Sequence, residues 1–169
     1  MSYRLVVGCI LSLLLFSCDK ENTLTDKYIL EKFEGIAQTD FNGNLIQDDV
    51  GDWQPRTCQD SNIVQLRSPK YFCFKPSYPN PTDRFTSIGY ALPRRSTVKI
   101  EIYSDVTTKI ATLITNDTLP SGSFQYYFDF GDTTRKHLPG IYRCYLEMKD
   151  LDSNKIYKSF GDIQLLSLK

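Results

Sequence analysis

The sequence has little of what most enzymes depend on. Its 169 residues include a single histidine, His137, which lies in a polar, turn-like stretch. It contains no H-E-x-x-H, no paired C-x-x-C, no phosphate-binding glycine loop and no nucleophile elbow. A Ser-His-Asp triad needs a nucleophile and a carboxylate at the histidine ring, and no motif of that kind surrounds His137. We therefore expect neither an enzyme nor a cofactor.

The sequence also lacks an excess of charge of one sign. Lysine and arginine together number 20, as do aspartate and glutamate, and no long run of one sign occurs. Proteins that bind nucleic acids usually present a basic patch or stripe. The charge balance therefore argues against a nucleic acid partner.

Only one long hydrophobic run is present, and it is too short to span a bilayer. Residues 5–16 are apolar, whereas a spanning helix needs roughly 20 such residues. Arg4 precedes the run, and the small residue Ser17 and the polar residues 19–23 flank its far end. This order is typical of a secretory signal. We predict that residues 1–17 are a signal peptide.

The string Leu15-Phe16-Ser17-Cys18 resembles the lipobox of bacterial lipoproteins. The resemblance implies that the thiol of Cys18 is acylated and that cleavage makes Cys18 the first residue. Each buried acyl methylene contributes ~0.8 kcal/mol, so two or three chains anchor a protein firmly to the membrane. We expect an outer-membrane lipoprotein of the cell envelope, either periplasmic or surface-exposed. The alternative is an ordinary cleaved signal in which Cys18 is incidental.

Three cysteines remain besides Cys18 and the signal-peptide Cys9. Export brings them into an oxidising compartment, where disulfides persist. We predict a disulfide between Cys58 and Cys73, with three reduced thiols as the alternative. Cys144 lies within an apolar alternation and is expected to be a small buried hydrophobic residue.

The organisation of the mature chain follows from its local patterns. Residues 18–28 are polar and are expected to be a tether. Residues 29–70 are irregular, with turn sequences at 40–44 and 48–53, and we expect them to pack on the domain that follows. That domain comprises residues 71–169.

Apolar and polar residues alternate strictly through the second half of the chain. A strand with one face in a hydrophobic core gives this period of two. The pattern predicts strands at residues 88–92, 98–103, 110–114, 124–128, 142–148 and 157–165. Together with the segment around Cys73, and with turn residues between the runs, this favours an all-β fold: an antiparallel β-sandwich of about seven strands.

Six short motifs occur in a fixed order within this domain. They are YPNP at 78–81, IGYALP at 88–93, VKIEIY at 98–103, IATLI at 110–114, LPSG at 119–122 and LPGIY at 138–142. In this order they resemble the Ig-like modules of flagellar hook-capping proteins and of type IX secretion sorting domains. The resemblance covers residues 72–169 and implies an Ig-like or fibronectin-III-like sandwich.

The length of the chain bears on which role to expect. Only about 50 residues separate Cys18 from the sandwich, too few for an independent enzyme core. We therefore expect a small membrane-anchored module that binds an envelope protein. A type IX sorting signal formed by residues 72–169 is the alternative.

Two candidate sites remain. Tyr103, Tyr127 and Tyr145 fall on outward-facing strand positions, where aromatic rings can stack on sugars. They predict a glycan-binding surface, or else they pack under loops or under the N-terminal segment. A loose calcium site is a weaker alternative to a plain turn, because the EF-hand spacing fails from Asp40 onward. Its oxygen ligands would be Asp40, Asn42, Asn44, Asp48 and Asp49. The expectation is that no metal is bound.

Overall fold

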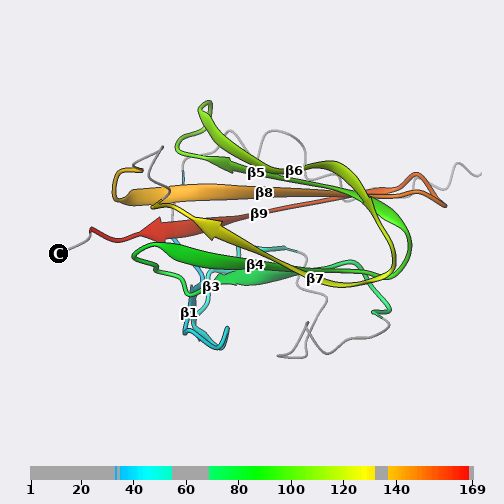
Figure 1. Cartoon of the computed structure of the whole chain (residues 1–169). Helices are drawn as coiled ribbons and strands as arrows, with labels where there is room; N and C mark the ends of the chain where they lie inside the picture. The colour runs from blue at the N-terminus through cyan, green and yellow to red at the C-terminus, as the bar shows by residue number, and fades with distance from the viewer. Residues whose placement is uncertain (1–32, 34, 55–68, 132–136, 168–169) are drawn as a thin grey trace, which may run out of the picture.

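The computed structural model describes residue 33 and residues 35–54, 69–131 and 137–167, and this part of the chain is all-β (Figure 1). It contains no helix, and all its paired strands run antiparallel. The predicted signal peptide, Cys18, the tether and Cys58 lie outside the described residues.

Within the described residues, nine strands form three sheets. They are β1 (Gln38–Thr39), β2 (Leu45–Gln47), β3 (Cys73–Tyr78), β4 (Phe85–Leu92), β5 (Ser96–Tyr103), β6 (Lys109–Leu119), β7 (Gly122–Asp129), β8 (Gly140–Asp150) and β9 (Ile156–Leu165). β1 and β2 form a short hairpin. The two larger sheets have the orders β3-β4-β7 and β6-β5-β8-β9, so the chain changes sheet after β4, after β6 and after β7.

The apolar sides of the two larger sheets contribute to one hydrophobic core. The alternating residues that predicted the strands supply it: Ile88, Tyr90 and Leu92 from β4, Val98, Ile100 and Ile102 from β5, and Tyr142, Cys144, Leu146 and Met148 from β8. All of them are buried. The predicted all-β, antiparallel fold is confirmed, and the period of two identified which face of β4, β5 and β8 enters the core.

The turn residues separate the strands as their chemistry requires. Pro120 cannot donate to a ladder, and β6 ends at the residue before it. β7 begins at Gly122, and β8 begins at Gly140 directly after Pro139. The peptide bonds preceding Pro79 and Pro81 are both cis.

The described part of the N-terminal segment packs against the two larger sheets. It carries the β1–β2 hairpin, which lies beside β3 in Figure 1. Ala37 and Trp53 are fully buried members of the core, and Thr39 forms a bridge with Asn80. Residues 35–54 are therefore part of the folded unit.

Candidate functional site

The three tyrosines predicted to form one platform lie on two different sheets. Tyr103 in β5 and Tyr145 in β8 alternate with core residues and face outward from the four-stranded sheet. Tyr127 belongs to β7 of the three-stranded sheet. Tyr127 is 70% exposed, whereas Tyr145 is only 5% exposed. The structure therefore does not bring the three rings together on one surface.

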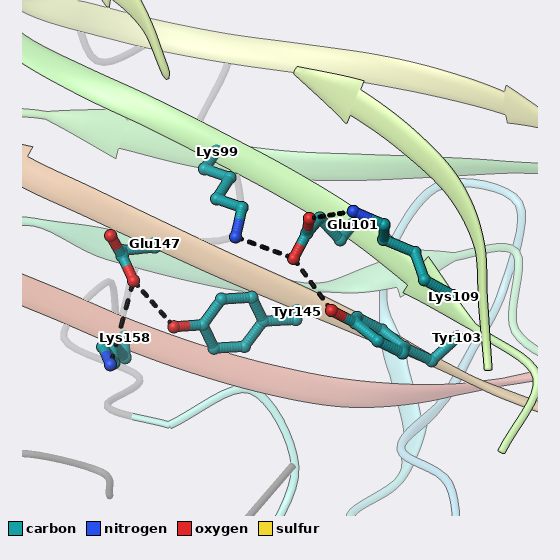
Figure 2. A network of polar contacts seen from close by, with 7 residues as sticks. All are labelled: Lys99, Glu101, Tyr103, Lys109, Tyr145, Glu147 and Lys158. Carbon is teal, nitrogen blue, oxygen red and sulfur yellow. Dashed lines mark hydrogen bonds and ion pairs between the residues drawn. The ribbon is translucent and has the colours of Figure 1, made fainter. Parts of the chain in front are cut away.

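Tyr103 belongs to a charged network on the outer face of the four-stranded sheet, centred on Glu101 (Figure 2). Lys109 Nζ donates to Glu101 Oε1 at 2.8 Å, and the Tyr103 hydroxyl donates to Oε2 at 2.9 Å. Lys99 Nζ also lies 2.9 Å from Oε2. Burial alone would raise the pKa of Glu101, but these hydrogen bonds outweigh it and lower the pKa. Glu101 is thus a stably ionised, buried carboxylate.

Tyr145 lies beside this network and has internal partners at both its ring and its hydroxyl (Figure 2). Its hydroxyl donates to Glu147 Oε2 at 2.9 Å, and Lys158 Nζ is 3.8 Å from the same oxygen. Lys99 Nζ lies 5.9 Å from the centroid of the ring. These contacts, together with its burial, give Tyr145 a structural position that offers no open ring to a sugar.

A buried arginine continues the outer face toward the N-terminal segment. Arg143 donates from Nε and Nη2 to the two carboxylate oxygens of Asp162, at 2.7 and 2.9 Å. Its guanidinium lies between two rings, 4.5 Å from the centroid of Phe33 and 4.4 Å from that of Phe160. Pairing and stacking together compensate the cost of burying the two charges.

Asp52 and Asn80 fix the N-terminal segment to β9, and we call this pair the clasp. Asp52 Oδ2 accepts hydrogen bonds from the backbone N–H of Ala37 at 3.3 Å and of Asp162 at 3.1 Å. Asn80 Nδ2 donates to the carbonyls of the same two residues, at 2.9 and 2.8 Å. Burial, and then the negative charge of Asp162, raise the pKa of Asp52 to about 7. Asp52 could not be recognised from the sequence as a functional residue, and Asn80 stood out there only as part of the YPNP motif.

Tyr127 lies on a mixed aromatic and polar surface of the three-stranded sheet. Gln125 Nε2 donates to the Tyr78 hydroxyl at 2.6 Å and also to Ser87 Oγ. In the described part of the chain, no hydrogen bond or ring contact involves the Tyr127 side chain. Its ring is therefore open to solvent beside fixed polar groups.

A charged pair borders this surface. Arg84 donates to both carboxylate oxygens of Asp129, at 3.0 and 2.9 Å. Its guanidinium also lies 4.5 Å from the ring centroid of Phe85, which is 49% exposed. We call the following residues the Tyr127 surface: Tyr78, Arg84, Phe85, Gln125, Tyr127 and Asp129.

The β1–β2 hairpin adjoins the Tyr127 surface at Tyr78. A Cβ added at Gly43 would lie 3.2 Å from the Tyr78 ring, and Gly43 has a φ of +79°, which favours glycine. The hairpin turn thus rests directly on that ring. The large apolar side chains exposed by this segment are Phe41, Leu45, Ile46 and Val50.

The residues of the loose calcium-site alternative form ordinary turns. Asp40 Oδ1 accepts hydrogen bonds from the backbone N–H groups of Asn42 and Asn44, both at 2.8 Å. Asp49 Oδ1 accepts from the N–H of Gly51 at 3.0 Å. Within the described residues, no three His, Cys, Asp or Glu side chains gather in a way that could hold a metal ion.

His137, which lies in a polar, turn-like stretch of the sequence, is half-buried. Its ring centroid lies 6.3 Å from that of Phe128 and 5.9 Å from those of Phe130 and Tyr142. The histidine therefore packs against an aromatic cluster at one end of the core.

Two cysteines, Cys73 and Cys144, lie within the described residues. Cys144 is a fully buried free thiol, as predicted, and burial raises its pKa. Cys73 is disulfide-bonded and fully buried. Its predicted partner, Cys58, lies outside the described residues, so the pairing stays a prediction.

Comparisons with protein families, curated proteins and solved structures found no match to this chain. No helix long and apolar enough to cross a membrane occurs in the described part of the chain. The candidate site therefore depends on geometry alone, and the exposed Tyr127 surface is the strongest candidate.

Proposed function

We propose that the protein is a non-enzymatic lipoprotein of the cell envelope that binds another envelope protein. Acylated Cys18 holds it in the outer membrane, and the Tyr127 surface of an Ig-like, fibronectin-III-like sandwich makes the contact. A small module with an anchor, a tether and one folded unit suits a binding role, whereas fold alone does not specify the partner.

A hydrogen bond at the start of β8 supports the Ig-like assignment. The hydroxyl of Tyr142 donates to the carbonyl of Leu138, four residues earlier. Ig-like domains carry such a tyrosine corner near the start of the corresponding strand, two residues before a cysteine. Cys144 stands at that position here. The two antiparallel sheets around one core agree with the same assignment.

The main support for the binding role is that aromatic rings are exposed on a regularly paired set of strands. Tyr127 in β7 and Phe85 in β4 are exposed, and these two strands pair in a regular register over eight residue pairs. The hairpin beside them exposes Phe41 and Ile46. Exposed apolar side chains that gather on one side of a domain mark interaction surfaces.

Capture from detergent-solubilised envelopes tests this role. The wild-type protein is expected to retain a specific envelope protein, and the double substitution Tyr127→Ala with Phe85→Ala is expected to lose it. Leu138→Ala removes an equally exposed apolar side chain elsewhere and serves as the matched control. Repeated capture of nothing specific by the wild type would contradict the proposal.

Membrane anchoring is tested separately. Cys18→Ser is expected to move the protein from the membrane fraction to the soluble fraction, because acyl burial supplies the affinity. Mass spectrometry of the mature chain should find an acylated N-terminal Cys18. An unmodified N-terminus at this residue would show the anchor to be wrong.

Glycan binding is a second candidate, which the surroundings of Tyr127 favour. An open ring beside a fixed amide, Gln125, and a fixed ion pair, Arg84 with Asp129, offers both stacking and hydrogen bonds to a sugar. A glycan array should then give binding that Tyr127→Ala abolishes and that Tyr145→Phe leaves unchanged.

A further inference from the structure

The sheet edges of this protein are protected in different ways. An unprotected edge strand presents unpaired backbone N–H and C=O groups and can accept another strand. The edge at β9 is closed by residues from other parts of the chain. The N–H of Trp53 donates to the carbonyl of Phe160 at 2.6 Å, and the N–H of Thr82 donates to that of Gln164 at 2.9 Å. The two clasp residues bond both backbone groups of Asp162: Asp52 accepts from its N–H, and Asn80 donates to its C=O.

The edges at β3 and β6 are also protected against strand addition. β3 lies against β1, and the backbone of Thr39 exchanges hydrogen bonds with that of Asn80 just beyond its end. β6 pairs with β5 through three register shifts, contains Asn116 at a φ of 53°, and carries the charges of Lys109 and Asp117. Bulges and edge charges are the usual protection against strand addition.

β7 has none of these protections among the described residues. Its eight residues pair with β4 without a register shift, from Phe85 opposite Asp129 to Leu92 opposite Gly122. It contains no proline and no lysine or arginine, and its single charge, Asp129, is paired with Arg84. The strand is therefore a regular and nearly uncharged edge.

The hydrogen-bond phase of β7 shows which backbone groups face outward. The N–H of Phe130 donates to the carbonyl of Arg84 at 2.9 Å, so these two residues form a hydrogen-bonded pair. Such pairs alternate with non-bonded pairs along an antiparallel ladder. The even-numbered residues of β7 therefore bond β4, and the N–H and C=O groups of Gln125 and Tyr127 point away from the sheet.

The side chains along this edge are also partly open. Phe124 and Tyr126 face the core but are only partly buried, and Tyr127 is exposed on the opposite face. An added strand would cover all three rings while satisfying the outward backbone groups of Gln125 and Tyr127. The edge thus offers both backbone and apolar contacts to an extended segment.

We propose that β7 pairs antiparallel with β7 of a second copy of this chain, joining two three-stranded sheets into one six-stranded sheet. The proposal rests on the proposed interaction role and names its partner. In the register centred on Tyr126, Gln125 of one copy lies opposite Tyr127 of the other. Each of the two equivalent pairs exchanges two backbone hydrogen bonds.

A second copy fits this edge because the strand is self-complementary. A twofold interface brings the same patch of both subunits together, so any unpaired charge near its centre would face its own sign. Between Gly122 and Phe128 the strand carries no charge, and Asp129 lies opposite Ser123 in this register. Anchoring at a membrane also raises the effective concentration of one copy around another.

Sedimentation equilibrium of the full-length mature chain carrying Cys18→Ser tests the proposal without detergent. Dimers are expected at high micromolar concentration. Tyr127→Pro removes an outward N–H but no hydrogen bond to β4. The dimer would lose two symmetry-related hydrogen bonds of ~1 kcal/mol each, so its dissociation constant should rise at least tenfold. Tyr127→Lys keeps the N–H and is expected to weaken the dimer too, which guards against misfolding of the proline variant. Leu138→Lys should leave it unchanged.

Amide hydrogen exchange supplies the second measurement. Exchange at Gln125 and Tyr127 should slow as concentration rises, while Lys109 in β6 should not respond. A monomer at every concentration, or a dimer unaffected by both Tyr127 substitutions, would overturn the proposal. Protection of β7 only after addition of envelope extract would overturn the second copy as partner, yet leave the proposed function standing. Loss of membrane anchoring would contradict the proposed function without affecting the dimer.

Discussion

The indole of Trp53 occupies the space into which a side chain at Gly161 would project. A Cβ at position 161 would lie only 2.0 Å from Trp53 Cε2. Trp53 itself is fully buried and has a φ of 58°, a conformation that costs a non-glycine residue about 1–2 kcal/mol. Burial of the ring against β9 offsets that cost, so the N-terminal segment and Gly161 depend on each other.

Gly161→Ala should therefore destabilise the protein. The added methyl group cannot fit without moving the indole, and overpacking of this kind typically costs about 1–3 kcal/mol. Urea unfolding followed by tryptophan fluorescence measures the change. Gly140→Ala is the matched control, because a Cβ there meets nothing within 4 Å. Equal midpoints for the two variants would contradict the contact.

The clasp predicts an unusual pH dependence. Burial and Asp162 raise the pKa of Asp52 to about 7 in the folded state, against an ordinary value of 3.8. The folded state therefore binds the proton more tightly, and the stabilisation, about 1.4 kcal/mol per pKa unit, is lost as pH rises from 4 through 7.

Asp52→Asn tests this dependence, since the amide oxygen can still accept from the two backbone N–H groups. Relative to the variant, the wild type should lose stability between pH 4 and pH 7, as measured by thermal unfolding. Asp48→Asn, in the exposed part of the same segment, should leave the wild-type profile unchanged. Parallel profiles for wild type and Asp52→Asn would refute the prediction.

The Glu101 network predicts the opposite sign. The lowered pKa of Glu101 means that its contribution is present above the unfolded-state pKa and is lost as pH falls through the folded-state value. Glu101→Gln should cost about 1–3 kcal/mol at pH 7, because a buried site loses charged hydrogen bonds. Glu147 is more weakly paired, since Lys158 Nζ lies 3.8 Å from its Oε2, and Glu147→Gln should cost under about 1 kcal/mol. Chemical unfolding at pH 7 and at pH 3 measures both, and the cost of Glu101→Gln should be smaller at pH 3 than at pH 7.

The predicted disulfide has its own test. Cys58→Ser should leave the protein at the membrane but destabilise it by about 3 kcal/mol, the chain-entropy value for a loop of roughly 15 residues. Thermal unfolding of the oxidised protein measures the loss. Intact-mass analysis after alkylation should find one free thiol, that of Cys144, in the wild type. Free thiols at both Cys58 and Cys73 would show the pairing to be wrong.

The strands could be predicted because their signal is local. Ile88, Tyr90 and Leu92 alternate with small residues, and that pattern alone identifies the face of β4 that enters the hydrophobic core, although the other face is buried too. β6 runs five residues beyond the predicted end at Ile114, through Thr115 to Leu119. The first four of these residues are polar and carry no alternation, since an edge strand can expose both faces. The length of β6 is set by its pairing with β5, and the local sequence pattern carries no information about that pairing.

The surfaces could not be predicted in the same way. Alternation correctly placed Tyr127 and Tyr145 on outward faces, but it carries no information about what lies over a face. Tyr145 is buried and contacts side chains from its own strand, at Glu147, and from β5, at Lys99, whereas Tyr127 is left open. The clasp was missed because its groups are adjacent only in the folded chain.

The hydrogen bond from the amide of Asp162 to Asp52 joins residues 110 positions apart. Synthesis delivers the N-terminal residues first, so Asp52 is made long before its partner on β9. Until then Trp53, the only tryptophan of the chain, has no core to enter. A chain truncated before Asp162 would therefore expose this indole to solvent, and proteases and chaperones can use such a ring to distinguish unfinished copies from complete ones.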